Sequence, residues 1–198
     1  AEWEVPFLHE TAAWIAAGNI GAITTVAIPG GLPVEVSGAG CVQLTIMRGV
    51  TGLDVEWVEG FALPPVQGYR APEADDLTMD CPAYGRMGLS GGVICEVPEP
   101  ATDNHVRCRV SVTGTAGQVF LQGPQNVYLL GTGASASPVW PEFAQEEGRR
   151  WSMAPMLQRL LDAVDSGALE VPCSGDDYRK ALEIAIAFKL SAANGNQR

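Results

Sequence analysis

The sequence predicts an α+β fold, with helices packed on one face of a largely antiparallel, open-faced sheet. Strand-like segments follow one another between residues 54 and 123, and no helical pattern lies between them. Glycine-rich turns split two of these segments into hairpins, and strands joined by hairpins pair antiparallel. Helical patterns lie instead towards the two ends of the chain, so the helices are expected to gather on one face of one sheet.

The first part of the chain predicts a helix, a strand and a second short helix. Residues 9–17 place apolar side chains on one helix face, and a glycine follows them as a stop. Residues 22–28 are rich in β-branched side chains and end at a Pro-Gly-Gly turn, which predicts a strand. The short helix, residues 43–52, carries on one side Leu44, Met47 and Val50.

The middle of the chain predicts strands and a loop. Residues 54–63 form the first strand, and residues 85–100 form two more around the Ser-Gly-Gly turn at 90–92. Residues 104–123 split in the same way at the turn 113–117. Residues 129–143, which are rich in Gly, Ser and Pro, are predicted to be a loop.

Two helices are predicted to close the chain, over residues 146–167 and 173–195. In the second, Ser174 is the expected N-cap, and Asp176 and Asp177 lie where acidic side chains favour the positive end of the helix dipole. The first helix repeats apolar side chains at helical spacing: Met156, Leu157, Leu160, Leu161 and Val164. The apolar face of the second helix consists of Ala181, Leu182, Ile184, Ala185 and Phe188.

Composition narrows the class of protein. With 198 residues, 46% of them hydrophobic, the chain suits one globular domain over residues 1–198. The formal net charge of −11 argues against a nucleic-acid partner, which needs clustered Lys and Arg. The five cysteines form no C-x-x-C pair and there are two histidines, so we expect no metal site. No apolar run reaches the about 18 residues of a membrane helix and no signal peptide is recognisable, so we expect a cytoplasmic protein without a membrane partner.

The stretch VEVSGAGCVQL, residues 34–44, partly matches a dinucleotide-binding loop. Gly38 and Gly40 fit the G-x-G-x-x-G fingerprint, but Gln43 occupies the position of the third glycine. A dinucleotide site also needs parallel strands with crossover helices, whereas this stretch is followed by hairpins. The sequence therefore predicts no cofactor-binding residues in this chain.

Four segments in order resemble the C-terminal domain of the Gfo/Idh/MocA family of NAD(P)-dependent oxidoreductases. They are WIAAGNIGAITTV with Pro6 upstream, VSVTGTAGQVFL, MLQRLLDAVDSG and SGDDYRKALEIAIAFKLSAANG, the last carrying the family's Ser-Ala at 191–192. The resemblance covers nearly all of the chain. It implies an open-faced sheet similar to the C-terminal domains of dihydrodipicolinate reductase and glyceraldehyde-3-phosphate dehydrogenase.

The resemblance also implies a function for the parent protein. Family members use NAD or NADP to transfer a hydride to or from a sugar, cyclitol or related polyol. Their N-terminal Rossmann domain is missing from this sequence, and so is a final strand expected after Arg198, so we expect a fragment with no cofactor of its own. A sheet with one face uncovered by its own helices further suggests a homo-oligomer formed through that face.

The family's acid/base residues are absent. Its pattern D-x-G-x-H-x-x-D, aligned on Gly40 and Gly52, places the first Asp at Gly38, the His at Val42 and the second Asp at Thr45. Gly and Val cannot take up a proton, so no catalytic residue is assigned. Two alternatives therefore remain open beside the dehydrogenase: a non-catalytic module that binds a sugar-like ligand, and a structural dimerisation module.

Five residues are candidates for contact with a substrate: Glu35, Gln43, Thr45, Asp177 and Tyr178. All but Tyr178 have a simpler explanation. Glu35 would be an exposed carboxylate at a strand end, Gln43 and Thr45 would face solvent from a short helix, and Asp177 would cap the last helix. Cys41 is expected to be a buried thiol and not a nucleophile.

Overall fold

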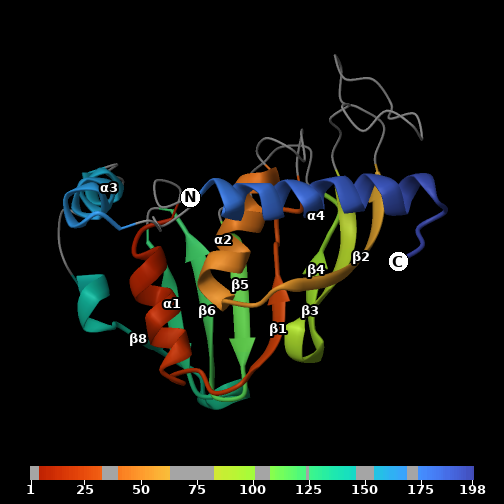
Figure 1. Ribbon diagram of the computed structural model, residues 1–198. Helices are drawn as coiled ribbons and strands as arrows, with labels where there is room; N and C mark the ends of the chain where they lie inside the picture. The colour runs from red at the N-terminus through yellow and green to blue at the C-terminus, as the bar shows by residue number, and fades with distance from the viewer. Residues whose placement is uncertain are drawn as a thin grey trace.

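A computed structural model describes residues 5–32, 40–62, 83–100, 108–123, 125–145, 154–168 and 174–198. Over these residues the chain forms an eight-stranded sheet, and α1, α2 and α4 lie across one face of it (Figure 1). The order of the strands across the sheet is β2-β3-β4-β1-β5-β6-β7-β8. The α+β architecture predicted from the sequence is confirmed.

The strands are β1 (Ile23–Ala27), β2 (Val55–Ala62), β3 (Ala83–Leu89), β4 (Val93–Val97), β5 (Cys108–Gly114), β6 (Gly117–Gln122), β7 (Val127–Leu130) and β8 (Ser137–Val139). Neighbouring strands are antiparallel except for β1 and β4, which are parallel. Val26 of β1 aligns with Cys95 of β4 on one side and with Val112 of β5 on the other. The central strand is therefore paired entirely with segments far away in the sequence.

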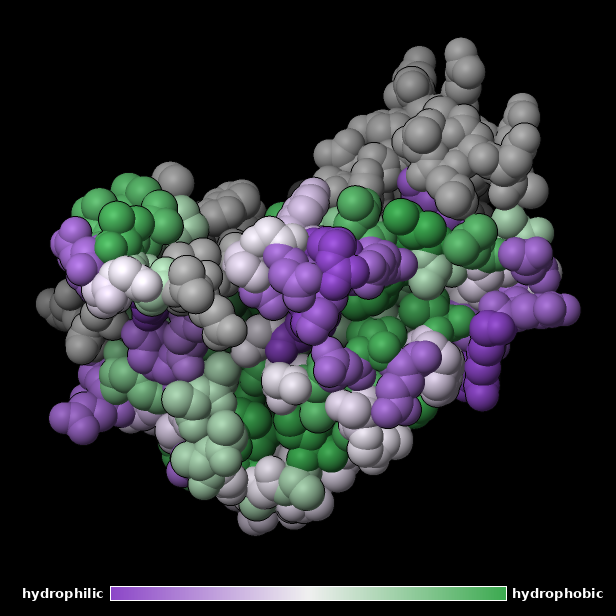
Figure 2. Space-filling view, viewed as in Figure 1, coloured by the Kyte–Doolittle hydropathy of each residue, from purple (hydrophilic) through white to green (hydrophobic). Residues whose placement is uncertain are grey.

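The helices are α1 (Leu8–Ala16), α2 (Cys41–Thr51), α3 (Ala154–Ser166) and α4 (Gly175–Ala193), with short 3-10 turns at 90–92, 133–135 and 142–145. Helix α4 packs on β2, while α2 lies between α1 and α4 and also contacts β5. Hydrophilic side chains gather over the N-terminal half of α4 (Figure 2). Helix α3 lies apart from this layer, at the side of the molecule (Figure 1).

The core lies between the helices and the sheet. One row of side chains crosses the sheet in register and is buried under the helices: Val58, Met87, Cys95, Val26, Val112, Val119 and Tyr128. Because side chains alternate along a strand, the neighbouring positions point to the other face. That face is more polar and is partly exposed, as shown by Thr25, Arg86 and Glu96.

A buried polar network joins α1 to the sheet. The hydroxyls of Thr11 and Tyr128 lie 2.8 Å apart, and Asn126 Nδ2 donates both to the Pro6 carbonyl at 2.7 Å and to the Tyr128 hydroxyl at 3.2 Å. Asn126 Oδ1 accepts a hydrogen bond from the main-chain amide of Gln122 at 3.1 Å. Every polar group of this cluster thus has a partner, which is the condition for burying it without a large penalty.

The predicted loop over residues 129–143 is correct only in part. The chain there forms β7 and β8, which pair with Tyr128 aligned with Val139. These strands have four and three residues, too few to show alternation in the sequence. Pro138 also signals a turn, but it is tolerated in β8 because this strand is the last in the sheet.

Candidate functional site

The region that aligns with the family's acid/base loop follows the carboxyl end of β1 and leads into α2. This end of β1 and the first turn of α2 lie at the same edge of the sheet, drawn at the top in Figure 1. Glu35 and Gly38 lie outside the described residues, so their roles stay predictions. The described part of the site begins at Gly40, which already has helical dihedral angles of −62° and −40°.

Val42, at the position aligned with the family's histidine, is half-buried and packs against the hydrophobic core. Its side chain has no ionisable group, and its contacts are those of a structural residue. The structure therefore offers no proton acceptor at this position.

The Gln43 side chain is not exposed, as its simpler explanation would require. Its side chain is 4% exposed, so the expectation that it faces solvent from a short helix is wrong. Its Oε1 atom is buried and has no hydrogen-bond partner among the described residues. A buried amide oxygen without a donor costs free energy, and such an atom is a place where a bound hydroxyl group could supply the missing hydrogen bond. Among the described side chains of α2, Gln43 is the one with a buried polar atom that lacks a hydrogen-bond partner.

The hydroxyl of Thr45 is already engaged. It donates to the carbonyl of Cys41 at 2.7 Å, one helical turn earlier. Its oxygen retains acceptor capacity for a ligand hydroxyl, but the proton is committed to the backbone. Cys41 is fully buried, which confirms the prediction of a buried thiol.

Asp177 belongs to the cap of α4. The Ser174 side chain accepts a hydrogen bond from the Asp177 amide at 3.2 Å, and Asp177 Oδ2 accepts one from the Ser174 amide at 3.0 Å. The two residues thus form a capping box, as the predicted N-cap at Ser174 implied. Tyr178, the next residue, has a half-exposed ring. A contact of either residue with substrate stays a prediction.

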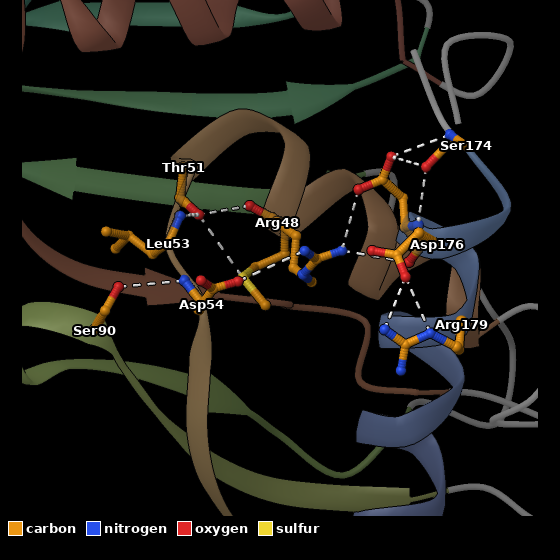
Figure 3. Close-up of polar contacts among 10 residues, drawn as sticks. Arg48, Thr51, Leu53, Asp54, Ser90, Ser174, Asp176 and Arg179 are labelled. Atoms are coloured by element: carbon orange, nitrogen blue, oxygen red, sulfur yellow. Dashed lines mark hydrogen bonds and ion pairs between the residues drawn. The ribbon is translucent and has the colours of Figure 1, made fainter. Parts of the chain in front are cut away.

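Arg48 connects these helices and was not singled out from the sequence. Its Nη1 atom donates to the main-chain oxygen of Asp177 at 3.3 Å and lies 3.7 Å from the Asp177 carboxylate. Its Nη2 atom lies 3.6 Å from Asp54 Oδ1, so one guanidinium joins the end of α2, the start of β2 and the first turn of α4 (Figure 3). A basic residue in the last turn of a helix was the available signal, but it also fits ordinary stabilisation of the helix dipole. The structure thus brings Asp177 to Arg48 of α2, and shows no contact of Asp177 with Gln43 or Thr45.

A groove of about 380 Å³ opens beside Arg48, between α2, α4 and the edge strand β2. Its floor is apolar, with Val55, Val58, Ile184 and Ala187, and its rim is charged, with Arg48, Asp54, Glu56, Lys180 and Glu183. Two of these charged residues are basic and three are acidic. The groove therefore has no consistent preference for an anion or a cation.

The last residues of the chain fold against β2. The Arg198 guanidinium lies 4.1 Å from the centre of the Trp57 ring and donates to Glu59 at 3.1 Å. Arg198, together with Arg86, lowers the pKa of Glu59 below its ordinary value. These contacts join the end of the chain to β2 and cover one face of the Trp57 ring.

Trp140 and Trp151 lie on either side of the segment that precedes α3 in the sequence. Trp140 is exposed, and its carbonyl accepts from Gln145 at 2.9 Å, while Trp151 lies outside the described residues. Among the residues that the structure covers, no three His, Cys, Asp or Glu side chains gather as a metal site. None of the described helices is long and apolar enough to cross a membrane.

Comparison with known proteins gives matches at the level of structure only. No family model matches the sequence, and no curated protein matches it significantly. The fold is similar to an oxidoreductase from Pseudomonas syringae, with 18% identity and a TM-score of 0.72 over 96% of this chain and 60% of that one. It is also similar to an aldose-aldose oxidoreductase from Caulobacter crescentus complexed with glycerol, with 17% identity and a TM-score of 0.66 over 99% and 60%.

A third match is an oxidoreductase from Agrobacterium radiobacter in complex with NAD+, L-tartaric acid and magnesium, with 22% identity and a TM-score of 0.64 over 98% and 61% of the two chains. The chain thus spans about 60% of the length of the solved structures that it matches. At these identities the matches show the fold. They confirm that this chain resembles the matched oxidoreductases in its fold, as predicted.

Proposed function

We propose that the chain is the substrate-side domain, over residues 1–198, of an NAD- or NADP-dependent oxidoreductase of the Gfo/Idh/MocA type. Its substrate would be a sugar, cyclitol or related polyol, and the protein would work in the cytoplasm. The observation that carries the proposal is the match over nearly the whole chain to oxidoreductases, each of which is longer than this chain by a further domain's length. Two of these have glycerol or tartaric acid, both polyhydroxy compounds, in their crystals.

The nucleotide is assigned to another domain because the residues present here do not fit it. The position of the third fingerprint glycine is held by Gln43, whose side chain is larger than the glycine that a close helix-strand contact needs. The strand before it, β1, has an antiparallel neighbour in β5. A Rossmann domain, in the same polypeptide or in a separate one, would supply the nucleotide site.

Within this chain, the proposed role is to bind and orient the polyol. Gln43 Oε1 would accept a hydrogen bond from one substrate hydroxyl, and the Thr45 oxygen would accept a second. The proton that leaves with the hydride would go to another group, because neither Val42 nor Thr45 can act as the base. If no such group exists, the chain is a ligand-binding module without catalysis, and the absence of the family's Asp and His favours this second candidate.

Calorimetric titration with glycerol, glucose, inositol and tartrate tests the substrate class. We expect saturable binding of at least one of them, weakened by Gln43→Leu because the amide oxygen is lost. The matched control is Gln158→Leu, on an exposed position of α3. Equal affinities in the Gln43→Leu variant and the unmodified chain would remove Gln43 from the site, and micromolar NADH binding would overturn the assignment of the nucleotide to another domain.

Self-association through the uncovered sheet face is the second part of the proposal. Phe120 and Ile94 lie half-buried on strands of this face, away from the helices. Light scattering should show an oligomer that the Phe120→Lys variant dissociates. A strict monomer at high protein concentration would contradict this part alone.

A further inference from the structure

Helix α3 directs its apolar side chains away from the rest of the domain. Their exposed fractions are 49% for Leu157, 48% for Leu160, 56% for Leu161 and 67% for Val164. These residues follow the i, i+3, i+4, i+7 spacing, so they form one stripe along the helix, which we call the α3 stripe. The surface shows this helix as a hydrophobic patch at the upper left (Figure 2).

The opposite, polar side of α3 attaches the helix to the domain. Arg159 Nη2 lies 3.1 Å from Glu10 Oε1 in the first turn of α1, and both side chains are largely buried. The usual arrangement of a surface helix is the reverse, with the apolar stripe inward and the charges in water. The apolar repeat predicted from the sequence is therefore correct, but the expectation that this helix packs on the sheet with the others is wrong.

An exposed stripe of this type indicates a missing contact. A helix of 13 residues is only marginally stable in water, and in proteins most of its stability comes from packing of its apolar face. Single exposed hydrophobic residues are ordinary on a protein surface, whereas a contiguous patch of four aliphatic side chains on one helix marks an interaction site.

We propose that the α3 stripe is the docking surface for the nucleotide-binding domain. This inference rests on the proposed function, because it requires such a domain. Two observations favour that occupant. Helix α3 lies next to the start of the described chain and is joined to it through Glu10 (Figure 1). The matched oxidoreductases have about two-fifths of their length outside the matched region, which is enough for a whole domain.

The position of α3 also suits the chemistry. The first turn of α2 and helix α3 both lie at the upper edge of the molecule (Figure 1). A domain seated on the α3 stripe would therefore adjoin the edge where Gln43 and Thr45 lie. A nucleotide held by that domain would then reach a polyol held by this one, as hydride transfer requires.

Site-specific photo-crosslinking tests the docking surface. The protein is produced from its intact gene in its source cells with p-benzoylphenylalanine at position 161, and the crosslinked peptides are identified by mass spectrometry. We expect crosslinks to an NAD-binding domain, in the same or another polypeptide, and about a tenfold lower yield when Leu157→Glu is added, because a charge must then be buried in the contact. The matched control is Leu190→Glu, the same change at an exposed leucine of α4, which should leave the yield unchanged.

Two outcomes would overturn the docking surface. Crosslinks from position 161 to residues 154–166 of a second copy would show that α3 is a self-association surface. The absence of crosslinks, with the protein folded by its melting temperature, would show that the stripe is free. Polyol binding by the chain does not involve α3. A failure to bind any polyol would therefore contradict the proposed function, while the crosslinking result alone would decide whether the α3 stripe is a docking surface.

Discussion

Arg48 connects α2 to α4 by donating a hydrogen bond from Nη1 to the main-chain oxygen of Asp177 at 3.3 Å. The same guanidinium lies 3.7 Å from the Asp177 carboxylate and 3.6 Å from Asp54. Its side chain is mostly buried, so the charge is shielded from water on most sides. We expect Arg48→Met to lower the free energy of unfolding by about 1 to 2 kcal/mol, because it removes one charge-assisted hydrogen bond and two ion pairs.

The control for Arg48→Met is Arg179→Met. Arg179 pairs with Asp176 at 2.7 Å and also with Glu183, but all three are exposed, and surface pairs of this type contribute little. Urea denaturation of both variants measures the difference. Equal stability losses would show that Arg48 is no more important than a surface ion pair.

Tyr128→Phe should destabilise the chain by about 1 to 2 kcal/mol. The substitution keeps the buried ring, but it leaves the buried Thr11 hydroxyl without the partner that lies 2.8 Å away. The control is Tyr84→Phe, at a ring that stacks on Phe61 with centroids 5.0 Å apart. Thermal melting should separate the two variants, and an unchanged midpoint for Tyr128→Phe would contradict the importance of the buried network.

Two glycine substitutions should change the free energy of unfolding in opposite directions. A Cβ at Gly60 would collide with the buried Phe188 ring, so we expect Gly60→Ala to cost about 1 to 3 kcal/mol. A Cβ at Gly49, which lies on the exposed side of α2, would meet Leu8 Cδ2 at an ordinary 3.8 Å. Gly49→Ala should therefore stabilise the chain by about 0.5 to 1 kcal/mol through helix propensity. Chemical denaturation of the pair checks both signs, and a destabilised Gly49→Ala would count against the packing around α2.

Stability should decrease in mildly acidic solution because of His9. Burial, the largest cause, lowers the pKa of His9 below its ordinary value of 6.5, while Glu10 opposes the shift. As the pH falls through 6.5, the unfolded chain takes up a proton on His9 and the folded chain does not, so the free energy of unfolding falls. This contribution is complete above 6.5 and is lost towards the lower, folded pKa.

The His9→Gln variant tests this pH dependence. Its melting temperature should change less than that of the unmodified chain between about pH 5 and 8. Identical slopes for the two proteins would show that His9 titrates in the same way in the folded and unfolded states.

Most of the fold was predictable because its local signals are strong. The turn at 90–92 separates β3 from β4, Gly52 ends α2 with a positive φ of 66°, and Ser174 caps α4. The parallel pairing of β1 with β4 was not predictable in this way. This pairing joins two segments about 70 residues apart, and neither segment carries a sequence pattern that identifies the strand with which it pairs.

The site was less predictable than the fold. Gln43 was singled out, but its burial depends on the helices on either side of α2, and a single amide in an 11-residue helix shows nothing of this in the sequence. The role of Asp177 in a capping box was predictable because both partners are close in sequence. The role of Arg48 was not, since its partner lies 129 positions away.

The position of β1 in the middle of the sheet has a consequence for how the chain folds. Thr25 pairs with Ile94 on one side and with Thr113 on the other, so both edges of β1 stay unpaired until these later segments fold. Contacts between such distant segments require closure of large loops, so they form slowly compared with hairpins such as β5–β6. During synthesis on the ribosome, β1 emerges long before its partners exist, and its β-branched edges stay open to other chains in the meantime. The order of synthesis therefore leaves β1, residues 23–27, open to misassembly until β4 and β5 have been made.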